Sequence, residues 1–153
     1  MLIQEMNPAA SVALLQESHL GRLACARGAQ PYITPFSFAY HQNVIYSFAT
    51  LGQRIAWMRE NPLVCAEVDA VVDARNWRSV IVFGRFVELP DEPAFRDQRV
   101  LAHQLLARTA SWWEPGYVKS IVAGVERRLV PIYFKIVIDD IRGHTGTSGA
   151  SHG

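Results

Sequence analysis

Three strand-like segments lie close together in the first third of the chain, at residues 22–26, 31–40 and 44–49. Each is rich in apolar side chains, and the second carries aromatic residues at every other position near its end. A turn of four residues follows the first segment, and a turn of three residues follows the second. Connections this short join antiparallel neighbours, because parallel strands need a crossover of a dozen or more residues. The sequence therefore predicts an antiparallel sheet.

The rest of the chain alternates between helices and further strands. Asn7-Pro8 predicts a helix start, because Asn caps free amides and Pro suits the first helical position. Gly84, inside the longest strand candidate, predicts a bulge or a bend at a barrel corner. The expected helices cover residues 8–18, 50–62 and 92–107, with a short one at 118–122, and the remaining strands cover 63–69, 77–89 and 131–138. Six strands with helices in the gaps predict a mainly β (α+β) fold, a small six-stranded antiparallel barrel with helical additions.

The length of 153 residues suits one domain. We find no internal repeat and no linker, so residues 1–142 are expected to form a single domain. The last residues, 143–153, are rich in Gly and Ser and are expected to be a flexible tail.

Charge and hydrophobicity narrow the choice of partners. The 15 Lys and Arg nearly balance the 14 Asp and Glu, which argues against a nucleic-acid-binding surface. Half of the residues are hydrophobic and only 19% are charged. A domain of this size usually needs more charge to coat its surface, so a partner subunit or a ligand is expected to cover part of it.

Cysteine usage and the absence of long apolar runs indicate a cytoplasmic protein. Cys25 and Cys65 lie in apolar, strand-like runs with no CxxC pattern, which predicts buried, reduced thiols. The first residues lack the basic and apolar regions of a secretory signal. No run approaches the roughly 18 apolar residues of a membrane span.

Familiar catalytic templates are missing. The sequence has no GxSxG, HExxH, P-loop or GxGxxG pattern, and its five histidines are scattered, so we expect no metal site and assign no catalytic residue. Glu67 and Asp69 alternate on one strand and share a face. A solvated strand face is favoured there over an acid pair.

Three local features have the residue types of a binding site. Around Ser47–Arg54 a strand passes through a small hydroxyl-bearing turn into a helix, where free amides and an Arg suit a phosphate monoester. Residues 34–37 interrupt a strand with Pro35 and leave backbone groups that a flat heterocycle can use. Residues 77–79 supply an aromatic face, a cation and a hydroxyl. For each feature taken alone, an ordinary structural role is favoured: a capped helix with a surface Arg, a plain edge strand, or a Trp that plugs a barrel end.

Taken in order, these features resemble one family over residues 14–143. The chain is similar to the pyridoxamine 5′-phosphate oxidase-related flavoproteins, and most similar to their nitroimidazole-resistance-like branch. The matching elements are Gly21-x-Leu23-Ala24, Pro31-x-x-x-Pro35, x-Gly52-x-Arg54, Asn61-Pro62, Glu67-x-Asp69, Trp77-x-Ser79-Val80 and Gly84. No single element is diagnostic, but their order and spacing together are fairly specific.

The resemblance implies a split β-barrel that binds FMN, as a homodimer with flavins at the subunit interface. It places the FMN phosphate at the turn of Thr50, Gln53 and Arg54. The isoalloxazine would lie against Thr34, Pro35, Phe36 and Ser37, and the ribityl chain beside Ser47, Phe48 and Ala49. Trp77 and Ser79 would approach the flavin near the dimer interface, from the same subunit or the other one.

The resemblance also implies an oxidoreductase in which NAD(P)H reduces the flavin and a small organic acceptor takes the electrons. The branch often has His where this chain has Phe48, which argues against chemistry that needs an imidazole there. We find no clear basic site for a substrate phosphate, so pyridoxamine phosphate itself is not the expected substrate. Trp112 and Trp113 suit an acceptor pocket and a dimer interface equally. The alternatives are a non-catalytic flavin-binding or redox-sensing protein, or a relative that binds the deazaflavin F420 or haem.

Overall fold

The computed structural model describes residues 1–108, 119–122, 124–128 and 130–149. Within them lie ten strands and three α-helices, with a short 3-10 helix, η1, before the last of these. The helices are α1 (Pro8–Glu17), α2 (Gln53–Glu60), η1 (Pro93–Phe95) and α3 (Arg96–Ala107). The strands are β1 (Leu2–Glu5), β2 (Leu20–Arg27), β3 (Gln30–Ser37), β4 (Ala39–His41), β5 (Val44–Ala49), β6 (Leu63–Asp73), β7 (Asn76–Leu89), β8 (Lys119–Val122), β9 (Val125–Arg128) and β10 (Ile132–Thr147).

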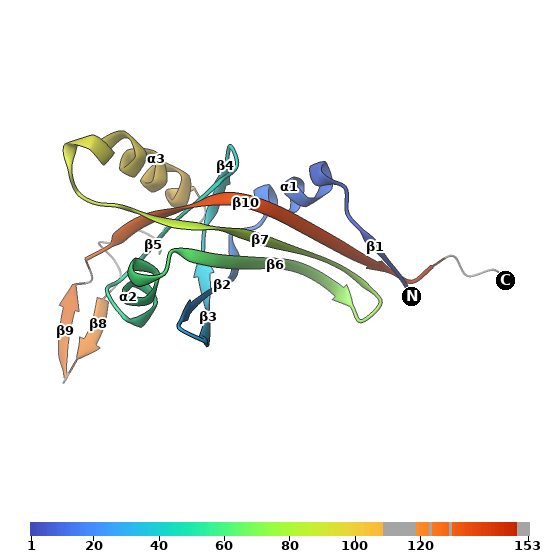
Figure 1. The fold of residues 1–153 in the computed structure, drawn as a ribbon, viewed down its shortest axis with the longest axis horizontal. Coiled ribbons are helices and arrows are strands. Elements are labelled where there is room, and N and C mark those ends of the chain that lie inside the picture. Colours follow the sequence, from blue (N-terminus) through green and yellow to red (C-terminus); the bar gives the residue numbers. More distant parts are fainter. Residues whose placement is uncertain (109–118, 123, 129, 150–153) are drawn as a thin grey trace.

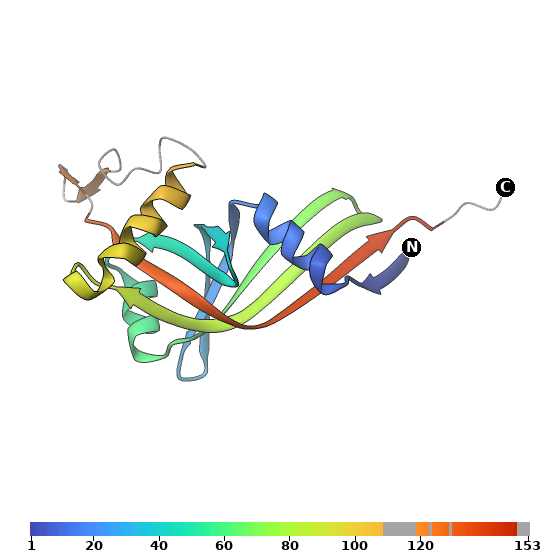
Figure 2. The same ribbon diagram turned by 90° about the horizontal axis from the view of Figure 1, so that it is seen from above.

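One curled antiparallel sheet organises the molecule (Figures 1 and 2). Its strand order is β3-β2-β6-β7-β10-β5-β4, and β1 pairs with β10. The strands at the two ends of this order, β3 and β4, are consecutive in the chain, so the sheet curls back toward its own start. The predicted antiparallel fold class is therefore confirmed, and the number of strands is higher than expected.

Local sequence signals account for several element boundaries. The Asn7 side chain accepts a hydrogen bond of 2.8 Å from the Ala10 amide, which caps α1 as predicted. Gln42 and Asn43 have φ angles of 48° and 63° in the turn between β4 and β5. Positive φ at both central residues is the requirement of a tight hairpin turn that follows the twist of the strands.

Two segments differ from the prediction. The helix expected at residues 118–122 is wrong, because residues 119–122 form β8, which pairs with β9. Residues 143–147 are not part of a flexible tail, because β10 continues through them to Thr147 and pairs with β1 and β7. Glycine is needed there because a side chain would clash with a neighbour: a Cβ on Gly146 would lie 2.6 Å from the indole nitrogen of Trp77.

The bulge predicted at Gly84 lies on the neighbouring strand. The register between β7 and β10 shifts between Ile138 and Asp140, opposite Gly84 and Phe83. Gly84 instead permits a close approach of the two backbones, because a Cβ there would lie 2.5 Å from the Val137 carbonyl oxygen.

The core has two parts on opposite sides of the curled sheet. The larger part lies inside the curl, where Leu14 and Leu15 of α1 pack with inward residues such as Phe134 and Ile136. The smaller part lies under α3, where Leu105 and Leu106 cover Tyr46 and Tyr133. No helix within the described ranges is long and apolar enough to cross a membrane.

Candidate functional site

The beginning of α2 leaves its first backbone amides without a side-chain cap. Gly52 is the N-cap residue, its backbone is extended, and it has no side chain that could accept a hydrogen bond. Its carbonyl accepts the first helical bond, from the amide of Ala56, at 3.0 Å. Free N–H groups at a helix start attract anions, so this end of α2 is electrostatically suited to a negatively charged group.

Arg54 lies in the first turn of α2 and connects it to β3. Its Nη1 donates to the Thr34 hydroxyl at 2.9 Å and to the Pro35 carbonyl at 3.2 Å. The guanidinium is partly buried, and this burial lowers the pKa of Arg54, while Tyr32 and Cys25 act in the opposite direction. Arg nevertheless keeps its charge at neutral pH. The structure thus joins Arg54, expected at the FMN phosphate, to Thr34 and Pro35, expected at the isoalloxazine.

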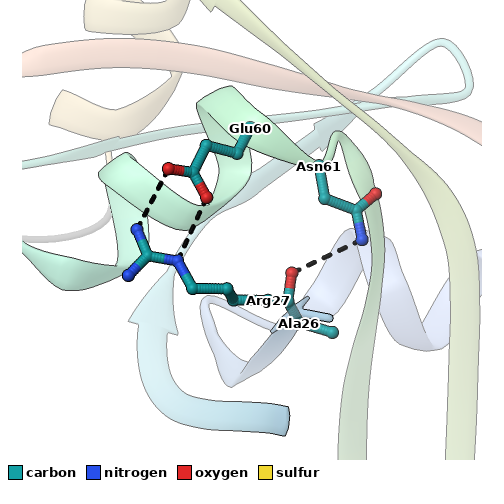
Figure 3. Close-up of polar contacts among 4 residues, drawn as sticks. All are labelled: Ala26, Arg27, Glu60 and Asn61. Carbon is teal, nitrogen blue, oxygen red and sulfur yellow. Dashed lines mark hydrogen bonds and ion pairs between the residues drawn. The ribbon is translucent and has the colours of Figure 1, made fainter. Parts of the chain in front are cut away.

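The nearby cations Arg27 and Arg59 differ from Arg54 in their partners, and Figure 3 shows the partner of Arg27. Arg27 of β2 binds Glu60 at the end of α2 through two hydrogen bonds of 3.0 and 3.1 Å. Arg59 binds Glu88 at 2.7 Å. Arg54 has only neutral partners within the part of the chain that the structure describes. A partly buried cation with neutral ligands is available to an anion, whereas its paired neighbours are not.

The other end of α2 is fastened to the sheet. Beside the Arg27–Glu60 pair, the Asn61 amide donates to the Ala26 carbonyl at 3.4 Å (Figure 3). The Arg27 guanidinium lies 5.2 Å from the centre of the Trp57 ring. These contacts hold the helix against β2 and so fix the position of its first turn relative to β3.

Ser47 and Ser37 join the two ends of the curled sheet. The Ser47 hydroxyl, fully buried on β5, donates to the Ser37 carbonyl of β3 at 2.6 Å. Both side chains were predicted to face a cofactor, but the Ser47 hydroxyl is already engaged inside the protein. Its structural role is to close the seam between β3 and β5.

Ser47→Ala is expected to lower the free energy of unfolding by about 1–3 kcal/mol, because it removes a buried hydrogen bond and leaves an acceptor less well satisfied. Urea denaturation monitored by tryptophan fluorescence measures the change. Ser18→Ala is a suitable control, because that half-buried hydroxyl donates to the Leu14 carbonyl of the helix it caps, a local contact. Equal losses in the two variants would contradict the role assigned to Ser47.

The remaining residues predicted around a cofactor differ in accessibility. Phe36 is buried and stacks on Phe38, with ring centres 5.3 Å apart, and Ala49 is also buried. Phe48 points to the other side of β5, where its ring lies 6.0 Å from that of Tyr133. Thr50 is half-buried and Gln53 is exposed, both beside the start of α2.

Trp77 and Ser79 are not brought to Arg54 within one chain. They lie at the beginning of β7, just after the hairpin turn that joins it to β6. Both ribbon views place this hairpin at the end of the molecule opposite α2 (Figures 1 and 2). Trp112 and Trp113 lie outside the described residues.

Glu67 is half-buried and Asp69 is exposed on the same face of β6, as the interpretation of a solvated strand face expects, and the two carboxyl groups interact there. Burial and neighbouring Asp69 together raise the pKa of Glu67 to about 7, whereas Arg22 and the Ser79 hydroxyl act to lower it. The signal was present in the sequence, because alternate strand positions share a face. The burial that couples the two carboxyl groups depends on the neighbouring strands.

His103 was assigned no role from the sequence. Its Nδ1 lies 3.0 Å from the Tyr133 hydroxyl, which brings an imidazole from α3 into the layer that contains Phe48. Burial raises the pKa of Tyr133, and the cation of Arg99, 5.0 Å from the ring centre, acts to lower it. Among the described residues, no group of three or more potential ligand side chains suits a metal ion.

Comparison with known proteins gives consistent matches over nearly the whole chain. The model of the family described as pyridoxamine 5′-phosphate oxidase matches residues 7–140. An uncharacterized protein of Rhizobium meliloti is 34% identical over 149 residues, which cover 97% of this chain and 99% of that protein.

Solved structures agree with this match. A FAD-binding protein from Mesorhizobium loti is 35% identical, with a TM-score of 0.79 over 96% of this chain and 100% of that one. A FAD-binding protein from Mycobacterium smegmatis is 16% identical, with a TM-score of 0.65 over 96% of this chain and 98% of that one. The second likeness is evidence for the shared fold alone.

Proposed function

Because the chain belongs to the pyridoxamine 5′-phosphate oxidase family, we propose that it binds FMN, with the phosphate held by Arg54 and the first amides of α2. The observation that carries this proposal is the partly buried guanidinium of Arg54, whose partners in the described residues are the neutral oxygens of Thr34 and Pro35. A phosphate would supply the missing negative charge through charge-assisted hydrogen bonds.

Residues near Arg54 offer polar groups and an apolar wall for the rest of a flavin. The Thr34 hydroxyl and the backbone beside Pro35 lie in hydrogen-bonding reach of the same guanidinium, so a ligand bound at Arg54 would extend along β3. The buried side chains of Phe36, Ser47 and Ala49 would serve as the wall behind it. Phe48 is half-buried and lies on the other side of β5, beside Tyr133.

Bound flavin would supply electron transfer between a reductant such as NAD(P)H and a small organic acceptor. We propose that two subunits enclose the flavins, so that Trp77 and Ser79 of one subunit reach the flavin held by Arg54 of its partner. The position of the β6–β7 hairpin, far from α2 in the same chain, supports this arrangement (Figure 1). Pyridoxamine phosphate is not the proposed substrate.

The purified protein is expected to be yellow and to show the visible absorption of an oxidised flavin. Mass spectrometry of the material released by heat distinguishes FMN from FAD, F420 and haem. FAD is the second candidate, because the Mesorhizobium loti relative is described as FAD-binding. FAD contains the same flavin mononucleotide half, so Arg54 would bind its inner phosphate. A colourless protein that takes up neither flavin on titration would contradict the proposal.

Turnover is tested separately from binding. Flavin-loaded protein is expected to oxidise NAD(P)H in the presence of quinones or nitroaromatic compounds, and steady-state absorbance measures the rate. Free FMN at the same concentration is the control, because it reacts slowly on its own. A protein that binds flavin but shows no rate above this control would instead be a non-catalytic flavin carrier or redox sensor.

A further inference from the structure

An exposed histidine of α3 is bound to a buried tyrosine of β10. The Nδ1 atom of His103 lies 3.0 Å from the Tyr133 hydroxyl, and the two rings meet edge to face, with centres 6.5 Å apart. Tyr133 is only 6% exposed, whereas the His103 side chain is exposed. The second ring nitrogen of His103, Nε2, is therefore left for proton exchange with solvent or with a ligand. A buried group thus holds one side of an imidazole whose other side is accessible.

The hydrogen bond between these two side chains can form in both charge states of the imidazole. Burial raises the pKa of Tyr133, while the nearby cation of Arg99 acts to lower it, and the phenol keeps its proton at neutral pH. That proton is donated to Nδ1 when the imidazole is neutral. When the imidazole is protonated, the Nδ1–H group donates to the phenol oxygen instead. Tyr133 can therefore hold the ring of His103 in place while Nε2 gives up or takes up a proton.

The charged groups around this pair have partners of their own. Within the described residues, the titratable and charged groups that face it are Arg99 of α3, Tyr46 of β5, Lys135 of β10 and Asp91 after β7. Arg99 lies 3.9 Å from Asp91, and Lys135 donates to the side chain of Gln98 at 2.7 Å. An imidazole is the side chain whose charge changes most readily near neutral pH. His103 is therefore the member of this group that is suited to exchange a proton.

Tyr133 places this pair beside the end of β5 that leads into α2. Tyr133 lies directly opposite Phe48 of β5, and the two ring centres are 6.0 Å apart. The strand β5 ends one residue after Phe48, and α2 begins at Gln53. Both ribbon views show α2 and α3 at the same end of the molecule (Figures 1 and 2). The proposed phosphate turn and His103 therefore border the same end of β5.

We propose that His103, held in place by Tyr133, faces the electron acceptor of the flavin site and donates the proton that the acceptor takes up with its electrons. The inference rests on the flavin site proposed above and adds an acid–base residue to it. In the reduction of a quinone, bound flavin supplies a hydride, which carries two electrons and one proton. His103 supplies the second proton: its Nε2–H bond breaks, an O–H bond forms on the quinone, and water returns a proton to the imidazole.

Binding of FMN to the apoprotein tests the position of His103 without any turnover. The His103→Gln variant identifies the NMR signals of this imidazole, and addition of FMN is expected to shift them. His41 is the internal control, because it pairs with Val44 at the other end of β5 and its signals are expected to stay unchanged. Quenching of flavin fluorescence in the same samples verifies binding. His103 signals that stay unmoved in FMN-loaded protein would overturn the proposed position and leave the flavin site intact.

Two electron acceptors separate proton transfer from electron transfer. A quinone takes up protons with its electrons, whereas ferricyanide takes up electrons alone. His103→Gln is expected to lower the rate of quinone reduction about 100-fold, the usual scale of general acid catalysis. The rate with ferricyanide and the affinity for FMN are expected to stay nearly unchanged. Stopped-flow absorbance of reduced, FMN-loaded protein mixed with each acceptor measures the rates.

His41→Gln is the matched control and is expected to keep both rates. Equal losses with the two acceptors in His103→Gln would show that His103 does not donate the proton.

The pH profile and chemical rescue identify the donor. Only the protonated imidazole can donate, so the wild-type rate with a quinone is expected to fall as rising pH removes the proton from His103. His103→Gln is expected to lose this dependence. Because His103 is exposed, imidazole added to the buffer is expected to restore part of the rate in His103→Ala. A wild-type rate that is constant or rises over this pH range would overturn the assignment.

Tyr133→Phe tests the positioning role of the phenol. The variant keeps the ring between Phe48 and Arg99 and removes only the hydroxyl. It is expected to lower the quinone rate roughly tenfold, the scale of one hydrogen bond, and to leave the ferricyanide rate unchanged. The ¹⁵N signal of Nδ1 in His103 is expected to shift, because that atom loses its partner. An unchanged Nδ1 signal, or equal losses with the two acceptors, would reduce Tyr133 to a packing residue.

Failure of this inference and failure of the flavin proposal give different results. A protein that binds no flavin would overturn both. A protein that binds FMN but reduces neither acceptor would overturn the proton transfer and keep the flavin site of a non-catalytic carrier. Quinone turnover that His103→Gln leaves unchanged would keep the oxidoreductase and exclude His103 as its acid.

Discussion

Arg54→Ala is expected to weaken FMN binding by about 1.5–3 kcal/mol, which corresponds to a roughly 10- to 150-fold rise in Kd. The variant removes the cation in the first turn of α2 that has no acidic partner among the described residues. Titration of the apoprotein with FMN, followed by the quenching of flavin fluorescence, measures the affinity. Thermal unfolding shows whether the loss of the bonds to Thr34 and Pro35 also affects the fold.

Riboflavin provides the matched ligand control, because it lacks only the phosphate. If Arg54 binds that group, Arg54→Ala should lower FMN affinity and leave riboflavin affinity nearly unchanged. Arg59→Ala is the matched protein control, because Arg59 lies on the same helix and is paired with Glu88. Equal losses for FMN and riboflavin, or wild-type affinity in Arg54→Ala, would show that the phosphate binds elsewhere.

Gly84→Ala is expected to lower the free energy of unfolding by roughly 3 kcal/mol, the upper range for overpacking a core. An added methyl group would lie 2.5 Å from the Val137 carbonyl oxygen and 2.7 Å from the Ile136 side chain. The obstacle is backbone in the central strand pair, so a side-chain rotation cannot relieve the clash. Urea denaturation of the purified variant measures the loss.

Gly52→Ala is the control for the general effect of replacing glycine on an extended backbone. A Cβ at Gly52 would lie 4.0 Å from its nearest neighbour, the Thr50 carbonyl oxygen, so there is room for it. We expect a change below about 1 kcal/mol there. Similar stability losses in the two variants would contradict the close approach at Gly84.

The early part of the fold is largely predictable because its signals are local. The Asn7 cap, the turn before Val44 and the strand Val44–Ala49 depend on neighbouring residues, and each was placed correctly. The end of the chain was not, because Gly143 and Gly146 have the composition of a linker. Their role became visible only where β10 approaches the residues around them, including Trp77.

The candidate site was also predictable only in part. The helix start with Arg54 and the strand with Thr34 were both singled out from residue types, since a cation at a helix N-terminus and a Pro-interrupted strand are local features. Their hydrogen bond joins residues 20 positions apart, and it depends on how α2 packs beside β3. The contact of His103 with Tyr133 depends on α3 covering β10, which no local pattern indicates.

The antiparallel class, most element positions and the family could be predicted from the sequence, because short connections, caps and motif order are local properties of the chain. The residues of the proposed phosphate site stay a prediction. Which charges are paired became clear from the folded structure alone. Arg27 and Arg59 form ion pairs with carboxylates, whereas Arg54 donates a hydrogen bond to a neutral oxygen. Glu67 interacts with the carboxyl group of Asp69. Ionisation and charge pairing depend on distance and burial in space, and the order of residues does not specify these quantities.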